Sequence, residues 1–320
     1  MKLGVFAVLY GEKTLESALD LVQKAGLQTV EIGTGGYVGK AHISPSEVLR
    51  DAGKIADLKR MVEQRGLSIS ALSCHGNPLH PNAAIAAEHH EDFQNTVRLA
   101  EALGVETVIT FSGCPGDSDT SQSPSWVTCP WPPDFLQVLD WQWSQKTIPY
   151  WREQSAFCRQ HGVRVAIEAH PGFVVYNTET ALRLRQETGD NIGVNFDPSH
   201  LFWQGMDPEE CIKKLGKSIY HVHAKDTRID ARNTSLNGVL DVKPYSNELE
   251  RSWIFRTIGY GNDMNVWKGI ISTLRKVGYD GAISIEHEDS LMSTDEGFKK
   301  AADFLKGIII GEQAGEMWWA

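Results

Sequence analysis

The sequence has no paired cysteines, no excess of basic residues and no long apolar run, and each absence excludes a class of protein. Five cysteines are scattered along the chain without a C-x-x-C pair: Cys74, Cys114, Cys129, Cys158 and Cys211. An odd, unclustered set of this kind argues against a disulfide framework and against a structural zinc knuckle. We therefore expect reduced thiols without a functional role.

Basic residues are outnumbered, with 31 Lys and Arg against 41 Asp and Glu, and the net charge is −10. A surface of this sign repels phosphate backbones and anionic lipids, so neither nucleic acid nor a membrane is an expected partner. No segment reaches the roughly 18 consecutive apolar residues of a membrane helix, and no small-residue cleavage site follows the first residues. The sequence thus predicts a cytoplasmic protein.

A repeated unit organises the chain. Short apolar runs alternate with segments of helical period, which is typical of parallel strands joined by crossover helices. We predict eight strands, at residues 2–9, 28–33, 67–74, 106–111, 163–169, 191–197, 218–224 and 281–286. Five helical segments end in a glycine shortly before the next strand, at Gly26, Gly66, Gly104, Gly162 and Gly278.

Eight strand–helix units predict an α/β fold, a single (β/α)8 TIM barrel over residues 1–320. An open doubly wound sheet is the alternative, but no glycine-rich phosphate turn follows the first strand. Two long connections, 112–144 and 225–262, follow carboxyl ends of strands, where a barrel builds its active site. The first holds four tryptophans that either suit the faces of sugar rings or pack the loop down: Trp126, Trp131, Trp141 and Trp143.

Polar side chains lie where the last four strands end: Glu168, Asp197, His223 and Glu286. In a barrel these strand ends converge on one mouth. Three carboxylates gathered with an imidazole repel one another unless a cation lies between them, and such O and N ligands suit Mn²⁺, Mg²⁺, Co²⁺ or Zn²⁺. The sequence therefore predicts a site for one divalent metal ion.

The segments that carry these residues are IEAHP (167–171), NFDPSH (195–200), HVHAKD (221–226) and GYDGAISIEHED (278–289). They resemble the sugar phosphate isomerase/epimerase group of xylose isomerase-like TIM barrels, which includes ketose 3-epimerases and inosose dehydratases. The resemblance implies that Glu168, Asp197, His223 and Glu286 bind the metal, for which we expect Mn²⁺ first. It also implies that Glu168 and Glu286 are catalytic, transferring a proton on a keto sugar through a metal-stabilised enediolate.

The same resemblance suggests substrate-binding residues. His200 matches a substrate-binding histidine of the group, and Arg228 resembles an arginine that grips a substrate hydroxyl. His170 and His75 are candidates from their positions after the fifth and third strands, with a structural role as the alternative.

Three further residues are less specific. Lys225 and Asp226 suit either a supporting salt bridge or substrate contact, and Glu31 ends the second strand. His287 is expected to point away from the mouth, because neighbouring side chains on a strand alternate in direction.

The reaction stays open between isomerisation or epimerisation and elimination. An enediolate expels a leaving group β to the carbonyl, so a lyase or dehydratase acting on a 3-keto-glycoside or an inosose would use the same residues. We expect a neutral sugar or sugar derivative as the substrate, because no P-loop or glycine-rich anion turn is present. The apolar end, Met317 to Ala320, suits either burial in a homo-oligomer or packing back onto the barrel.

Three other functions fit less of the sequence. A glycosidase would use two strand-end glutamates but leaves Asp197 and His223 without a role. The endonuclease IV branch of the resembled group needs an Asp-x-His pair where this chain reads Asp226, Thr227 and Arg228. A non-catalytic sugar-binding barrel would show no metal-dependent proton exchange.

Overall fold

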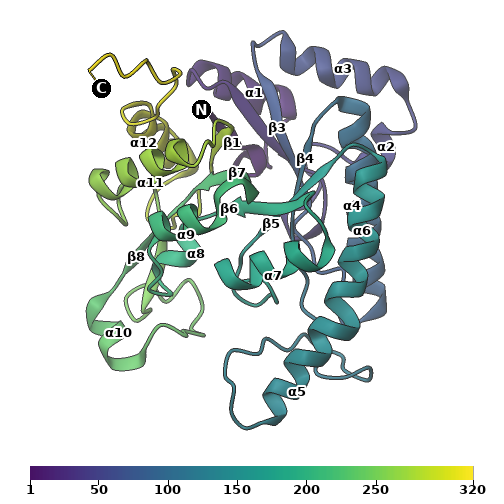
Figure 1. The fold of residues 1–320 in the computed structure, drawn as a ribbon. Coiled ribbons are helices and arrows are strands. Elements are labelled where there is room, and N and C mark those ends of the chain that lie inside the picture. Colours follow the sequence, from purple (N-terminus) through teal and green to yellow (C-terminus); the bar gives the residue numbers. More distant parts are fainter. Residues whose placement is uncertain (320) are drawn as a thin grey trace.

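The computed structural model describes residues 1–319 and contains a closed barrel of eight parallel strands (Figure 1). The strands follow one another around the barrel in the order β1-β10-β7-β6-β5-β4-β3-β2, and β1 pairs with both β10 and β2. Their bounds are β1 Lys2–Phe6, β2 Thr29–Gly33, β3 Ser68–Ser73, β4 Thr107–Phe111, β5 Arg164–Glu168, β6 Ile192–Phe196, β7 Ile219–Ala224 and β10 Ala282–Ile285. The predicted TIM barrel is confirmed, and the open sheet is excluded.

Helices surround the strands in Figure 1. They are α1 Leu15–Lys24, α2 Pro45–Val48, α3 Ala52–Glu63, α4 Ala83–Leu103, α5 Asp134–Trp141, α6 Ile148–Gln160, α7 Thr178–Thr188, α8 Ser199–Phe202, α9 Pro208–Leu215, α10 Ala231–Asn237, α11 Met264–Lys276 and α12 Thr294–Lys306. The five glycines predicted to end helices have φ between 65° and 85°. Because only glycine adopts this left-handed conformation without strain, each one stops its helix before the strand that follows.

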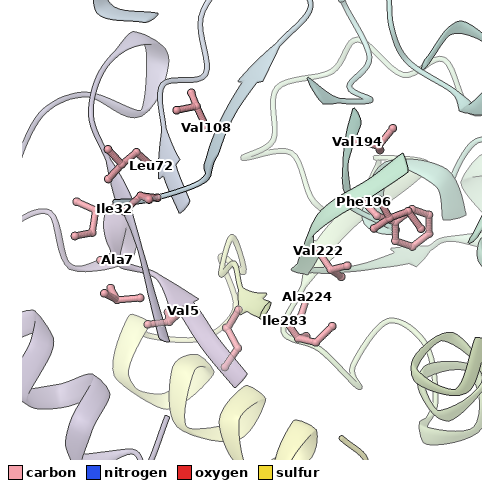
Figure 2. Close-up of a cluster of buried hydrophobic side chains, with 14 of the residues drawn as sticks. Val5, Ala7, Ile32, Leu72, Val108, Val194, Phe196, Val222, Ala224 and Ile283 are labelled. Atoms are coloured by element: carbon pink, nitrogen blue, oxygen red, sulfur yellow. The ribbon is translucent and has the colours of Figure 1, made fainter. Parts of the chain in front are cut away.

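The hydrophobic core lies between the strands and the helices. Figure 2 shows buried side chains of this layer, among them Ile32 of β2 and Val222 of β7. Successive side chains of a strand point to opposite faces, so the neighbours Glu31 and His223 point into the barrel. Their side chains form a hydrogen bond with each other although β1 and β10 lie between the two strands. The pattern that fills the core thus aims polar residues at the barrel interior.

The connection 225–262 contains an antiparallel strand pair, β8 (Asp226–Ile229) and β9 (Trp253–Arg256), with α10 between them. The sequence did not indicate these strands, because each has only four residues and little alternation. Their position depends on tertiary contacts: the Trp253 ring stacks on Trp203 with 4.8 Å between centroids and 6° between planes. The insertion is therefore an ordered hairpin fixed to the barrel.

The connection 112–144 contains α5, which continues through a π-helical turn at Gln142–Thr147 into α6. Its four tryptophans have different environments. Trp143 is buried under the Arg183 guanidinium, Trp141 lies under Lys146, and Trp131 is 73% exposed. Trp126 is half-buried and packs against two aromatic clusters, one with Phe111 and one with Phe255. The tryptophans are not one sugar-binding set, since Trp143 is a packing residue.

Two chain-wide features bear on earlier expectations. Within residues 1–319, no helix has the combined length and apolarity that crossing a membrane requires. All five cysteines are free, and burial raises the pKa of Cys74 to about 12.

Trp318 is 87% exposed and Met317 68% exposed, so the described part of the carboxy-terminal end does not pack onto the barrel.

Asp226 fixes the base of the hairpin, and it supports a first prediction. Its Oδ2 accepts hydrogen bonds from the backbone N–H groups of Gly259 and Asn262, at 3.0 and 2.9 Å, and from the Trp267 indole at 3.2 Å. Asp226→Asn turns an amide toward these donors, so we expect the free energy of unfolding to fall by about 2–4 kcal/mol. Urea denaturation measures it, with the exposed Asp140→Asn as control; equal stability of the two variants contradicts the assignment.

Candidate metal centre

Four side chains converge at the carboxyl ends of β5, β6, β7 and β10, which are consecutive in the barrel. Glu168 is the last residue of β5 and His223 lies in β7, while Asp197 and Glu286 directly follow β6 and β10. One potential ligand atom from each lies within 4.8 Å of the others, and only Glu286 is not fully buried. The structure therefore brings the four predicted metal ligands together.

His223 is held between two sets of carboxylates. Its Nε2 lies 2.9 and 3.0 Å from the Glu31 oxygens, and its Nδ1 lies 2.8 Å from Glu286 Oε2 and 3.2 Å from Glu168 Oε2. Burial opposes charge on the imidazole, but Glu31 and Glu286 outweigh it and hold the pKa of His223 well above its usual range. The cluster thus favours a positive charge at this position.

Glu31 fixes the orientation of the His223 ring. Burial opposes its ionisation, yet the neighbouring His223 and His221 lower the pKa of Glu31 to about 2, and Ser73 Oγ donates a hydrogen bond at 2.5 Å. An ionised Glu31 accepts the Nε2 proton and so directs Nδ1 toward the cluster. Carboxylates that orient a metal-binding histidine in this way also raise its basicity.

Glu168 is surrounded by donors. Its Oε2 accepts a hydrogen bond from Asn195 Nδ2 at 2.8 Å and lies 3.0 Å from His75 Nε2. Burial raises the cost of the charge, but His75 and hydrogen bonds from the neighbouring histidines hold the pKa of Glu168 well below its usual range. Glu168 is therefore an ionised carboxylate whose Oε1 is the less engaged oxygen.

Three buried atoms of the cluster form no hydrogen bond of acceptable geometry among the described residues, although two of them lie 2.8 Å apart: Asp197 Oδ2, His223 Nδ1 and Glu286 Oε2. Leaving buried polar atoms unpaired is costly, so such atoms need a partner. Burial also raises the pKa of Asp197 to about 6, with Glu168 and Glu286 adding to the effect of burial. A divalent cation among these atoms satisfies them and offsets the charge, and the donor set fits one.

The neighbouring group Glu31, His221 and His223 fits a metal less well, although its ligand atoms also lie within 4.8 Å of one another. Both Glu31 oxygens already face His223 Nε2. His221 Nδ1 lies 3.1 Å from Asn195 Oδ1, and its Nε2 lies 3.3 Å from Ser70 Oγ. Because these atoms are paired, the group supports the cluster and does not compete with it.

Lys225 and Asp226, which the sequence left between two roles, take different ones. Lys225 Nζ lies 3.1 Å from Glu286 Oε1 and 2.7 Å from Glu288 Oε2, so it forms ion pairs at the edge of the cluster. Asp226 accepts backbone hydrogen bonds at the hairpin base. His287 points elsewhere: its Nδ1 lies 3.5 Å from Thr257 Oγ1 and its ring faces Gly297.

The histidines predicted to contact substrate line the cluster. His200 Nε2 lies 3.2 Å from Asp197 Oδ2 and 3.5 Å from Glu168 Oε1, and neither His200 nitrogen has a hydrogen-bond partner among the described residues. The His170 ring lies 4.2 Å from the His200 ring, and burial together with His200 lowers the pKa of His170 to about 3. His170 is neutral, and His75 contacts Glu168 directly.

Arg228 lies apart from these residues. It is exposed on β8, and the hydrogen bond found for it within residues 1–319 goes to the Gly261 carbonyl at 3.4 Å. No ion pair joins it to the four-residue cluster within the same residues. Its contact with substrate stays a prediction.

Sequence reasoning missed Asn195 and undervalued Glu31. Asn195 precedes Asp197 by two residues, so strand alternation places both on the same face; this signal was available. Glu31 lies at an inward position of β2, but nothing local to β2 indicates that it meets His223 of β7.

The fold and the cluster together define the class of the protein: a closed parallel TIM barrel whose strand ends bring together three carboxylates and an imidazole that could hold a metal ion. The chain belongs to the xylose isomerase-like TIM barrel family, whose model matches residues 19–308. The family resemblance expected from the sequence is therefore confirmed.

The chain is similar to two relatives in sequence and to two solved structures in fold. It is 36% identical over 312 residues to the uncharacterized protein YfiH of Bacillus subtilis, covering 97% of this chain and 99% of that one. It is 27% identical over 161 residues to the inosose dehydratase of Mesomycoplasma hyopneumoniae, covering 47% and 50%. The IOLI protein with a bound zinc atom has a TM-score of 0.66 at 19% identity, covering 97% and 98%. An L-ribulose 3-epimerase has 0.62 at 17%, covering 95% and 93%.

The orientation of His223 by Glu31 generates a second prediction. Isothermal titration of the metal-stripped protein with Mn²⁺ should give one site per chain, and Glu31→Gln should weaken binding about 10- to 100-fold because the ring loses its anionic partner. Glu63→Gln, an exposed change on α3, is the matched control. Folding of both variants is checked by circular dichroism. Equal Mn²⁺ affinity of the Glu31→Gln and Glu63→Gln variants would show that Glu31 does not orient His223 for metal binding.

Proposed function

We propose that this protein is a divalent-metal-dependent sugar isomerase or epimerase that transfers a proton on a keto sugar or sugar derivative. One observation carries the proposal: Glu168, Asp197, His223 and Glu286 present ligand atoms within 4.8 Å of one another at the strand ends. Their residue types suit Mn²⁺, which we propose as the native ion, or Mg²⁺, Co²⁺ or Zn²⁺. Family membership supports an enzyme of this kind.

Glu168 and Glu286 are the proposed proton-transfer residues. A bound divalent ion supplies positive charge that stabilises the negative charge developing on the sugar oxygens. Glu168 is ionised and its Oε2 is held by Asn195 and His75, which leaves Oε1 to accept a proton from carbon. Glu286 is held at Oε1 by Lys225, which leaves Oε2 toward the cluster.

The destination of the proton determines the product. A proton removed by one glutamate and returned to the same carbon from the other side inverts that carbon, and a proton returned to the neighbouring carbon isomerises the sugar. His200 and His170, next to Glu168, are proposed to bind substrate oxygens. Arg228 is proposed to reach a more distant hydroxyl, and His75 to position Glu168.

A lyase or dehydratase is the second candidate. The similarity to an inosose dehydratase over about half of the chain favours it. Removal of the same proton from a 3-keto-glycoside or an inosose, followed by loss of a β substituent, needs no different residues. The substrate is proposed to be neutral, and with a net charge of −10 neither nucleic acid nor a membrane is proposed as a partner. The exposed Trp318 and Trp319 favour association between copies of the chain.

A third prediction tests the proposed function. Deuterium from solvent should enter free ketoses, keto-glycosides or inososes in the presence of Mn²⁺, as observed by NMR, and EDTA should abolish the exchange. Glu286→Gln should lower its rate by a factor of about 10² or more, because the amide cannot carry the proton. Glu250→Gln, an exposed change in the connection 225–262, is the control. Sugar hydrolysis that survives EDTA, without exchange, would indicate a glycosidase instead.

The product of the same reaction is a fourth prediction and separates the two candidates. An epimer or an aldose is expected if the protein is an isomerase or epimerase. An unsaturated ketone, with release of water or of an alcohol, would identify the lyase. The NMR spectra that record deuterium uptake also identify these products.

A further inference from the structure

A groove of about 460 Å³ lies beside the cluster, between the hairpin connection and the segment after β10. Tyr245, Ile254 and Phe255 line one wall, and Glu288, Met292 and Thr294 line the other. Ser290 Oγ donates a hydrogen bond to Glu248, which joins the two segments. The volume falls in the range of roughly 300–1,000 Å³ that is usual for small-molecule sites.

Lys225 connects the groove with the cluster. Its Nζ forms ion pairs with Glu286, a proposed proton-transfer residue, and with Glu288 of the groove wall. The same Nζ lies 4.3 Å from the centre of the Phe255 ring, which also lies 5.5 Å from the ring of His200. The Lys225 side chain is therefore all that separates Glu288 of the groove wall from Glu286 of the cluster.

The inner wall of the groove is a column of stacked charged and aromatic groups. Tyr245 stacks on Phe255 with 5.7 Å between centroids and 28° between planes, and the Arg251 guanidinium covers Tyr245 at 4.4 Å. Tyr245 is nevertheless 56% exposed, and within residues 1–319 no hydrogen bond is found for its hydroxyl. The column holds Tyr245 in place while more than half of its surface stays exposed.

The lining suits a neutral, hydroxyl-rich ring. Ile254 and Met292 offer apolar contact, and Tyr245 and Thr294 offer hydroxyl groups. Glu288 is about half exposed and accepts hydrogen bonds, whereas Asp289 Oδ2 is already bonded to the Thr257 backbone and to Arg256. Glu288 lies in the lining together with these hydroxyl and apolar groups, which suits a neutral ring better than a phosphate.

We propose that this groove is a subsite for a second, neutral sugar ring, so that the substrate is a keto sugar in glycosidic linkage. The inference rests on the proposed function for the identity of the reacting ring. The first ring lies at Glu168 and Glu286, and the second ring lies beyond Lys225 against Tyr245 and Glu288. Free monosaccharides leave the groove empty and bind more weakly.

The test measures binding of unreactive probes, so it does not depend on turnover. Methyl α- and β-glycosides of glucose and galactose are compared, by isothermal titration with Mn²⁺ present, with disaccharide methyl glycosides that contain the same ring. We expect at least one two-ring probe to bind tenfold or more tightly than its one-ring partner. Absence of any such advantage across the panel overturns the proposal.

Substitutions locate the advantage in the groove. Tyr245→Ala should reduce the two-ring advantage to less than threefold, and Tyr245→Phe, which keeps the stacking, should retain part of it. Thr294→Trp fills the groove from the opposite wall and should also abolish the tighter binding of two-ring probes. This variant keeps the test valid if Tyr245→Ala disturbs the hairpin. Leu249→Ala, a 93% exposed position in the same connection, is the control. An unchanged advantage in Tyr245→Ala and Thr294→Trp overturns the subsite.

The deuterium exchange described above distinguishes the two failures. If two-ring probes bind more tightly than one-ring probes but no metal-dependent deuterium exchange is seen, the proposed function is wrong and the subsite stands. Exchange that runs equally well on free and glycosidic keto sugars, with no two-ring advantage in binding, removes the subsite alone.

Discussion

Mutual repulsion of three carboxylates around His223, two of them fully buried, is the constraint on which the other features of the site depend. Charges taken out of water are expensive unless each has a partner, and the closed barrel brings these together at one mouth. Neighbouring groups lower that free-energy cost. Asn195 and His75 donate hydrogen bonds to Glu168. Ser199 donates its backbone N–H to Asp197, and Lys225 forms an ion pair with Glu286. The oxygen and nitrogen atoms of the cluster that remain without a hydrogen bond face one another, and this arrangement suits a divalent cation.

The amino-terminal half of the barrel supports this arrangement although the ligands come from the carboxy-terminal half. Glu31 of β2 receives a hydrogen bond from Ser73 and faces His223, so one side of the barrel fixes a ring that belongs to the other. His75, which follows β3, does the same for Glu168. Residues at the first strands therefore fix the orientation of the candidate ligands that the last strands supply.

The sequence predicted those features that follow from short-range pattern. Short apolar runs between helical segments, together with the terminal glycines, predicted eight strands in the right places, and the strand ends indicated the four clustered residues. The contact of Glu31 with His223 joins residues 192 positions apart, and no local pattern encodes such a pairing. The hairpin of β8 and β9 was missed for the same reason, because Trp203 fixes it from outside the connection. Arg228 lies on that hairpin, so its exposed position followed from a fold element that the sequence did not indicate.

The choice between epimerisation and elimination does not depend on a residue that one reaction has and the other lacks. In the mechanism proposed above, both begin with a proton leaving carbon for Glu168 or Glu286, and both leave the second glutamate to deliver a proton. Lys225 is held by two carboxylates at the boundary between the cluster and the groove, where an oxygen joining two sugar rings would lie. If the substrate is the proposed two-ring sugar, the Lys225 ammonium group would contact that oxygen in either reaction and would stabilise it further when its bond to carbon breaks. Under the proposed function the outcome therefore depends on whether the bound sugar carries a leaving group β to the carbonyl, a hydroxyl or a second ring, since the same residues serve both paths.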